Sequence, residues 1–210
     1  DGSEEEGYIP FQIAFSDLVG NSGEDYSSTT DVSSILFDIT PPDNFQLDSA
    51  YAVGGNEIFG YWNASNNSIV LETPISITDE SLVGGSFQPL ISIGGGEFEN
   101  FGSPIEIVEV PETGSVLLEI AGNIFESMSN YSDNINAIFT TKIIDKAGNE
   151  TQGLSDGTII HVDEIIPTLD SIGISTNNAL SNNWATSPDN IALEWISNEG
   201  LNNVISIIIN

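Results

Sequence analysis

The feature that most constrains this chain of 210 residues is an internal repeat. Its clearest copy is the segment Ala137–Pro167, where an alternating apolar run, the turn sequence Asp-Lys-Ala-Gly-Asn and a second apolar run precede a proline. Phe11, Ile13, Phe15 and Asp17 recur as Phe139, Thr141, Ile143 and Asp145, 128 residues later (145 − 17). Alternation with a period of two indicates a strand with one buried face, and Asp, Gly and Asn favour tight turns. A chain that repeats such units folds as a series of similar domains.

A second recurrence defines the domain limits. Leu169-Asp170-Ser171 repeats Leu47-Asp48-Ser49 at a spacing of 122 residues (169 − 47), and the strand around Ile191 repeats the strand around Ile69 at the same spacing. The pair Pro41-Pro42 marks a stiff junction, because proline cannot donate to a sheet. We therefore predict one complete domain over residues 43–166. Residues 1–42 would be the last strands of a preceding repeat, and residues 167–210 the first strands of a following one.

The pattern of short apolar runs and turn signals predicts an all-β sandwich. No long stretch has the periodicity of a helix, and only the segment Phe125–Ser129 indicates a helical turn. We expect the strands to lie within Tyr8–Ser16, Val32–Asp38, Phe45–Val53, Ser68–Ile77, Ser86–Ile93, Ile105–Val110, Val116–Ile120, Ala137–Ile144 and Thr158–Val162.

The charge of the chain excludes several kinds of partner. Thirty-two Asp and Glu residues face 2 Lys and no Arg, so the formal net charge is -30. Such a field repels nucleic acids and anionic membrane surfaces. No run of about 18 apolar residues indicates a membrane-spanning helix. With 0 Cys, disulfides and zinc–sulfur sites are excluded as well.

The repeated turn carries a resemblance to a known family. An Asp-x-x-Gly-Asn turn, then a strand, then an Asp followed by proline resembles the Ig-like repeats of large secreted bacterial adhesins and surface proteins. Asp17–Asn21 with Asp38–Pro42 matches this pattern, and Asp145–Asn149 with Asp163–Pro167 matches it with a longer exit. The resemblance implies a Greek-key β-sandwich, an extracellular location at the cell surface, tandem arrays that act as spacers or adhesive stalks, and Ca²⁺ at domain junctions.

Acidic residues near the two junctions are the candidate metal ligands. They are Asp17, Asp38 and Asp43 at the first junction, and Asp145, Asp163 and Glu164 at the second. Strand-end and turn carboxylates could together supply the six to eight oxygens that Ca²⁺ requires. The alternative is that Asp17 and Asp145 only cap their own turns, by accepting hydrogen bonds from backbone N–H groups.

Aromatic side chains offer a second kind of site. Tyr61, Trp62 and Trp184 could stack on sugar rings, as aromatics do in carbohydrate-binding sandwiches, or lie in the core, where we expect Trp195. The single His161 lacks a nearby Cys, second His or carboxylate at ligand spacing, so it is expected to be structural. None of the common catalytic motifs occurs.

These observations predict a non-enzymatic repeat module that acts as a spacer or stalk. Ca²⁺ bound at the domain junctions could stiffen it. The alternative function is carbohydrate binding within a secreted protein. Neighbouring repeats are the expected partners. Because each partial repeat would leave strand edges and apolar faces uncovered, we also expect that the half-domains of separate chains could complete one another.

Overall fold

The computed structural model of the chain describes residues 5–201. The chain divides into two compact units, one ending at Asp163 and one beginning at Glu164. The described residues are almost entirely strands and loops, with one short helix, α1 (Gly122–Glu126), so the all-β expectation is confirmed. Residues 1–4 and 202–210, which belong to the two expected partial repeats, lie outside the described part.

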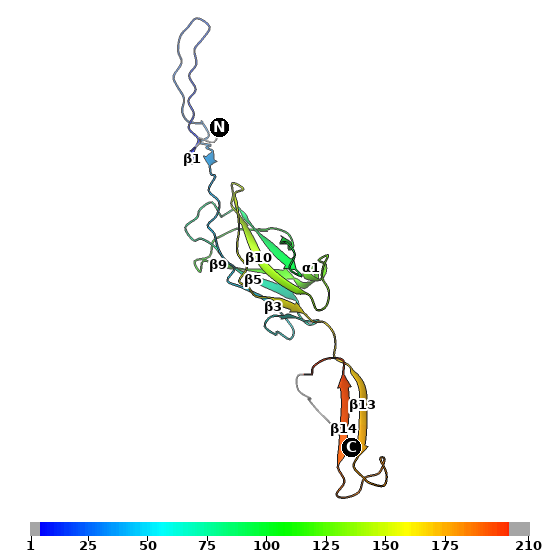
Figure 1. The fold of residues 1–210 in the computed structure, drawn as a ribbon. Coiled ribbons are helices and arrows are strands. Elements are labelled where there is room, and N and C mark those ends of the chain that lie inside the picture. Colours follow the sequence, from blue (N-terminus) through cyan, green and yellow to red (C-terminus); the bar gives the residue numbers. More distant parts are fainter. Residues whose placement is uncertain (1–4, 202–210) are drawn as a thin grey trace. The chain divides into compact units, whose positions relative to one another are not determined.

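The centre of the first unit is a sandwich of two sheets (Figure 1). The smaller sheet has the order β3-β5-β9, and the larger has the order β4-β12-β10-β6-β7, with β11 on β10 and β8 on β6. The strands of the smaller sheet are β3 (Ser49–Val53), β5 (Ser68–Pro74) and β9 (Ser115–Ala121). Those of the larger sheet are β4 (Tyr61–Trp62), β6 (Ser86–Ile93), β7 (Glu99–Asn100), β8 (Ile105–Glu106), β10 (Asn136–Ile144), β11 (Glu150–Gln152) and β12 (Ile160–Val162).

The two sheets bury one continuous apolar core between them. β5 and β6 are buried along almost their whole length, and their buried residues include the polar Ser68, Thr73, Gln88 and Ser92 as well as apolar side chains. One polar contact crosses this core: the hydroxyl oxygens of Thr73 on β5 and Thr141 on β10 lie 3.0 Å apart. Because both side chains are fully buried, this hydrogen bond satisfies two groups that would otherwise lack partners.

Phe125 of α1 is the centre of an aromatic cluster at one end of the core. Its ring centroid lies 5.3 Å from Trp62, 5.0 Å from Tyr131 and 5.9 Å from Phe139, all in edge-to-face geometry. Such arrangements add to the gain from burial because the ring edges face negative ring surfaces. The Trp62 indole is fully buried, as the core alternative for this residue predicted.

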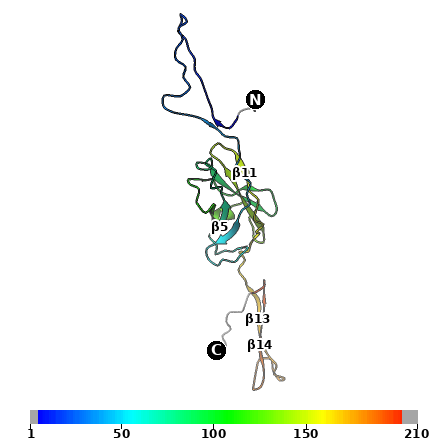
Figure 2. The same ribbon diagram turned by 90° about the vertical axis from the view of Figure 1, so that its left-hand side faces the viewer.

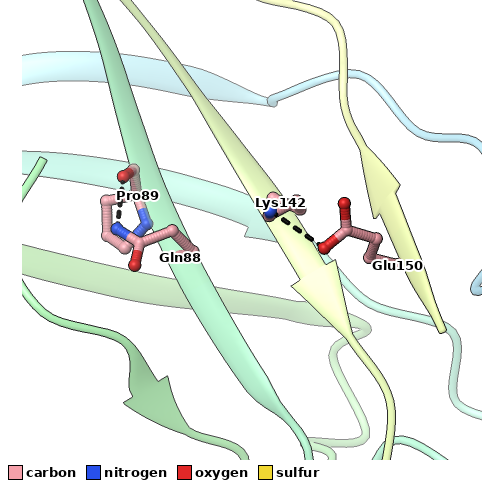
Figure 3. A network of polar contacts seen from close by, with 4 residues as sticks. All are labelled: Gln88, Pro89, Lys142 and Glu150. Atoms are coloured by element: carbon pink, nitrogen blue, oxygen red, sulfur yellow. Dashed lines mark hydrogen bonds and ion pairs between the residues drawn. The ribbon is translucent and has the colours of Figure 1, made fainter. Parts of the chain in front are cut away.

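β6 contains a proline in its interior, which a paired strand seldom accepts. Thr141 is the partner of Pro89 on β10, while the Pro89 carbonyl accepts a hydrogen bond from Phe101 N on the opposite side. The Gln88 side chain donates to the same carbonyl at 2.8 Å and to Gly102 O at 3.2 Å (Figure 3). The proline is tolerated because its missing N–H faces this irregular edge rather than β10, and the Gln88 amide supplies hydrogen bonds there.

On the other side of β10 the pairing with β11 is reinforced by charge. Lys142, one of the 2 basic residues of the chain, lies 2.9 Å from Glu150 of β11 (Figure 3). The Glu150 side chain is more than half exposed, so the ion pair contributes little to stability. Its geometry nevertheless favours the observed register of the two strands.

The N-terminal part of the first unit is an arm that pairs only intermittently. β1 (Gly7–Tyr8) pairs with β2 (Leu36–Phe37), and single bridges join Ile13 to Tyr26 and Ser16 to Ser22. The continuous strands expected over Tyr8–Ser16 and Val32–Asp38 are therefore shorter than predicted. Pro10 lies inside the first segment and has no N–H to donate to a ladder, and the apolar side chains of this arm are largely exposed.

The second unit contains one antiparallel hairpin, β13 (Leu169–Thr176) and β14 (Ile191–Ser197), visible in Figure 2. Its register places Ile172 opposite Trp195 and Ile174 opposite Leu193, so these apolar residues share one face. Trp195, expected in a core, is only half-buried on this face.

The aromatic cluster gives a stability prediction. Replacing a buried phenylalanine by alanine leaves a cavity and costs about 3–5 kcal/mol. We expect Phe125→Ala to lower the free energy of unfolding of the sandwich by that amount in urea titrations followed by circular dichroism. Phe59→Ala is the matched control, since 83% of the Phe59 side chain is exposed and its loss removes little packing. Equal effects of the two substitutions would contradict the assigned core.

Candidate functional site

The turn Asp145–Asn149, between β10 and β11, is built around a buried carboxylate. Asp145 Oδ1 accepts hydrogen bonds from Gly148 N at 2.7 Å and Asn149 N at 2.9 Å, and Oδ2 accepts one from Asn149 Nδ2 at 2.9 Å. The backbone closes the same loop, since Asp145 N donates to Asn149 O. Gly148 has a φ of 98°, which glycine adopts at little cost. Three donors therefore fix the carboxylate and the turn together.

The repeated turn Asp17–Asn21 is built in a similar way, although its aspartate is exposed. Asp17 Oδ1 accepts from Asn21 N at 2.8 Å and from Val19 N at 3.0 Å, while Oδ2 accepts from Asn21 Nδ2 at 2.6 Å. The Asn21 side chain is the main cause that lowers the pKa of Asp17, since it stabilises the charged form. The capping alternative for Asp17 and Asp145 is thus what the structure shows.

The two turns differ in what lies beside them. Asn149 Nδ2 also donates to the carbonyl oxygen of Asp38 at 3.2 Å, and the Thr151 hydroxyl donates to the carbonyl of Pro42 at 2.5 Å. Asp38 and Pro42 delimit the linker between arm and sandwich, and Pro42 itself is buried. The residue corresponding to Thr151 near the first turn is Gly23, which has no side chain to donate. Within residues 5–201, the linker 38–42 is held by the second turn and not by the first.

The arm holds the same linker from its other side. Glu6 Oε1 accepts hydrogen bonds from Ile39 N at 3.0 Å and from the Thr40 hydroxyl at 2.5 Å. The bond from Thr40 and then that from Ile39 are the largest causes of a lowered pKa of Glu6. We call this set the linker joint: Glu6, the linker 38–42, Asn149 and Thr151.

Beyond the joint the chain enters the sandwich in parallel with the segment after β11. Leu47 N donates to Leu154 O at 2.9 Å, and Leu154 N donates to Phe45 O at 3.0 Å. The Gln46 side chain adds a bond to Ser155 O at 3.1 Å. These three hydrogen bonds attach the segment after the linker to the sandwich.

The structure places the predicted metal ligands of the two junctions in different surroundings. Across residues 5–201, no three His, Asp or Glu side chains lie close enough to hold a metal ion. Asp38 and Asp43 line one shallow groove with Glu6, whereas the backbone of Asp163 donates to Trp62 O. Glu164 belongs to the second unit. Asp17 and Asp145 use their oxygens within their turns, and calcium binding at the junctions stays a prediction.

The aromatic candidates separate into buried and exposed groups. Tyr61 is 44% exposed, and its ring stacks on His161 with the centroids 5.6 Å apart. His161 is therefore a surface residue of β12 that supports a neighbouring ring. Trp184, in the loop between β13 and β14, is 76% exposed.

The residues that make the joint were not found from the sequence. The sequence assigned Asn149 to a turn and gave no role in a joint to Glu6 or Thr151. The difference between Thr151 and Gly23 in otherwise matching turns was the available signal.

Comparison with known proteins finds no matching family model, no similar curated protein and no similar solved structure. Within the part of the chain that the structure describes, no helix has the length and apolar character needed to cross a membrane.

The hydrogen bonds of Glu6 give a pH prediction. Its pKa in the folded state lies below the ordinary value of about 4.3, so its contribution to the joint is complete above that value and is lost as the pH falls through the folded pKa. We expect the amide signals of Ile39 and Thr40 to move with this lowered pKa in an NMR titration. Thr40→Val should raise the Glu6 pKa toward its ordinary value, and an unchanged pKa would contradict the assigned cause.

The capped turns give a prediction about calcium. If Asp17 and Asp145 remain bound to their own backbones, the melting temperature should be the same in excess Ca²⁺ and in chelator. A ligand at 100 times its Kd would otherwise stabilise the folded state by about 2.7 kcal/mol. A large rise with Ca²⁺ that Mg²⁺ does not reproduce would show that the junction acids rearrange around the ion.

Proposed function

We propose that this chain is part of a non-enzymatic, extracellular Ig-like repeat protein of the bacterial adhesin type, in which it serves as a spacer or stalk. The linker joint is the observation that carries this proposal. A spacer must hold successive domains in a fixed order under tension. In the linker joint, Asn149 and Thr151 of the sandwich donate hydrogen bonds to the linker 38–42, and Asn149 is itself held by Asp145.

The order of strands supports an Ig-like sandwich. In a constant-type Ig domain, strands A, B and E share one sheet with D, and strands C, F and G form the other. The order β3-β5-β9 corresponds to A-B-E, and the neighbours β6, β10 and β12 correspond to C, F and G. An isolated parallel bridge joins Gln46, just before β3, to Leu154, between β11 and β12.

The flanking hairpins support a tandem array. The bridge Ser16↔Ser22 of the arm corresponds to the pair Ile144↔Glu150 of the sandwich at the repeat spacing of 128 residues (144 − 16). β13 and β14 correspond in sequence to β3 and β5 at the spacing of 122 residues, although their pairing register is shifted by two residues. Both hairpins carry an apolar face that a complete repeat would bury, so neighbouring repeats are their natural partners.

Carbohydrate binding is the second candidate function, and the exposed rings of Tyr61 and Trp184 favour it. It is less well supported than the spacer. The Trp62 indole lies in the core, and His161 covers one face of Tyr61, which reduces the flat surface that a sugar ring could use.

The joint can be tested by measuring backbone motion in the whole chain. In the wild type we expect the amides of Ile39 and Thr40 to have order parameters like those of the sandwich, about 0.85. The double variant Asn149→Ala with Thr151→Val should lower these values below about 0.6, because the linker loses both donors. Nitrogen-15 relaxation measures this directly.

The repeated turn supplies a matched control. Asn21→Ala removes the corresponding asparagine from a turn of the same geometry that holds no linker, so the linker should stay ordered. If the double variant left the linker as ordered as in the wild type, the joint would not be the stiffening element, and the spacer proposal would lose its main support.

A further inference from the structure

The smaller sheet ends in an exposed edge at β9. Gly122 N donates to Asn67 O and Ile75 N donates to Gly114 O, which fixes the hydrogen-bonded pairs of the β5–β9 ladder. Antiparallel pairs alternate, so the backbone groups of Leu117, Glu119 and Ala121 point away from β5. Among the described residues no backbone partner faces them.

A groove runs along this edge, between β9 and the segment 105–111 of the other sheet. Apolar residues form its floor: Phe87, Ile107 and Leu118 are almost completely buried. Two more apolar side chains stay largely exposed beside it, Val108 at 73% and Leu117 at 61%. A free strand edge next to an apolar groove is the arrangement that accepts an added strand.

The charge around the groove selects the chemistry of the occupant. Glu106, Glu109 and Glu119 line it, and neither of the 2 lysines does. A second copy of this chain would bring a further net charge of -30 against these carboxylates, so pairing of two β9 edges is disfavoured. A basic segment gains attraction instead, both during approach and when bound.

We propose that the β9 edge is a docking site for an extended, basic segment of a partner protein, with apolar and basic side chains in alternation. The segment adds to the smaller sheet beside β9, at the position that strand D takes in a constant-type Ig sheet. Its apolar side chains face the groove, and its basic side chains meet Glu119 and the other glutamates. This surface is independent of the linker joint, so the two proposals can fail separately.

Three peptides of seven residues, the length of β9, test this site with the full chain. The first has the sequence TKVKVKT, the second is its acidic counterpart TEVEVET, and the third is TKVKVKT with N-methyl groups on alternate residues. We expect the first to bind and to shift the amide signals of Leu117, Glu119 and Ala121. N-methylation should weaken binding at least about tenfold, because it removes several backbone hydrogen bonds.

Charge reversal on the chain separates specific docking from general attraction. Glu119→Lys should weaken binding of TKVKVKT about three- to tenfold. Glu97→Lys makes the same change of net charge in the exposed loop after β6, at the far end of that strand from β8, and should have a smaller effect.

Several outcomes would overturn the proposal. Shifts scattered over the acidic surface would indicate attraction without a site. Equal binding of TEVEVET or of the N-methylated peptide would exclude the basic or the strand-like character of the occupant. A dimer of the chain alone that Glu119→Lys alters would assign the edge to a second copy.

Discussion

The hydrogen bonds of the buried Asp145 carboxylate fix the turn on which the pairing of β10 with β11 and the attachment of the linker depend. Left without donors, a buried carboxylate would cost several kcal/mol, so the three N–H groups that reach it fix the shape of the turn. That turn sets the register of β10 and β11 and orients Asn149 toward Asp38. Strand pairing and linker attachment thus have one local cause, which the sequence repeats at Asp17.

Much of the fold could be predicted from the sequence because its strands are either strongly apolar or strictly alternating. β6 has the same limits as the predicted strand, and β10 begins one residue earlier than its predicted strand. β4, β7 and β11 could not be predicted, since two or three residues carry no periodicity and pair only because longer strands lie beside them. The interior of β6 shows the same limit: Pro89 argues against a paired strand until the side chain of Gln88 is seen to compensate for it.

The candidate site was predictable only in part. The pattern Asp-x-x-Gly-Asn predicts a turn in which the aspartate accepts hydrogen bonds from backbone N–H groups. In both copies the asparagine N–H donates to the aspartate. The linker joint could be found only from the structure, because its contacts join residues far apart in the sequence. Glu6 and Thr40 are 34 residues apart, and Thr151 and Pro42 are 109 apart. Acidic residues are so numerous that their positions along the chain do not indicate which of them meet. The β9 edge likewise follows from strand order, which composition does not determine.

In the proposed tandem array, the hydrogen bond between Thr73 and Thr141 would help neighbouring domains to fold separately. The residues that correspond to this pair at the spacings of 122 and 128 residues are Trp195 and Ile13, which cannot form it. If the hairpin of a neighbouring repeat replaced β10 during folding, Ile13 would stand where Thr141 belongs, and the Thr73 hydroxyl would be buried without a partner. This hydrogen bond in the core therefore distinguishes β10 from a hairpin of similar sequence pattern. Dissimilar cores in adjacent domains limit the exchange of strands that threatens long arrays of repeats.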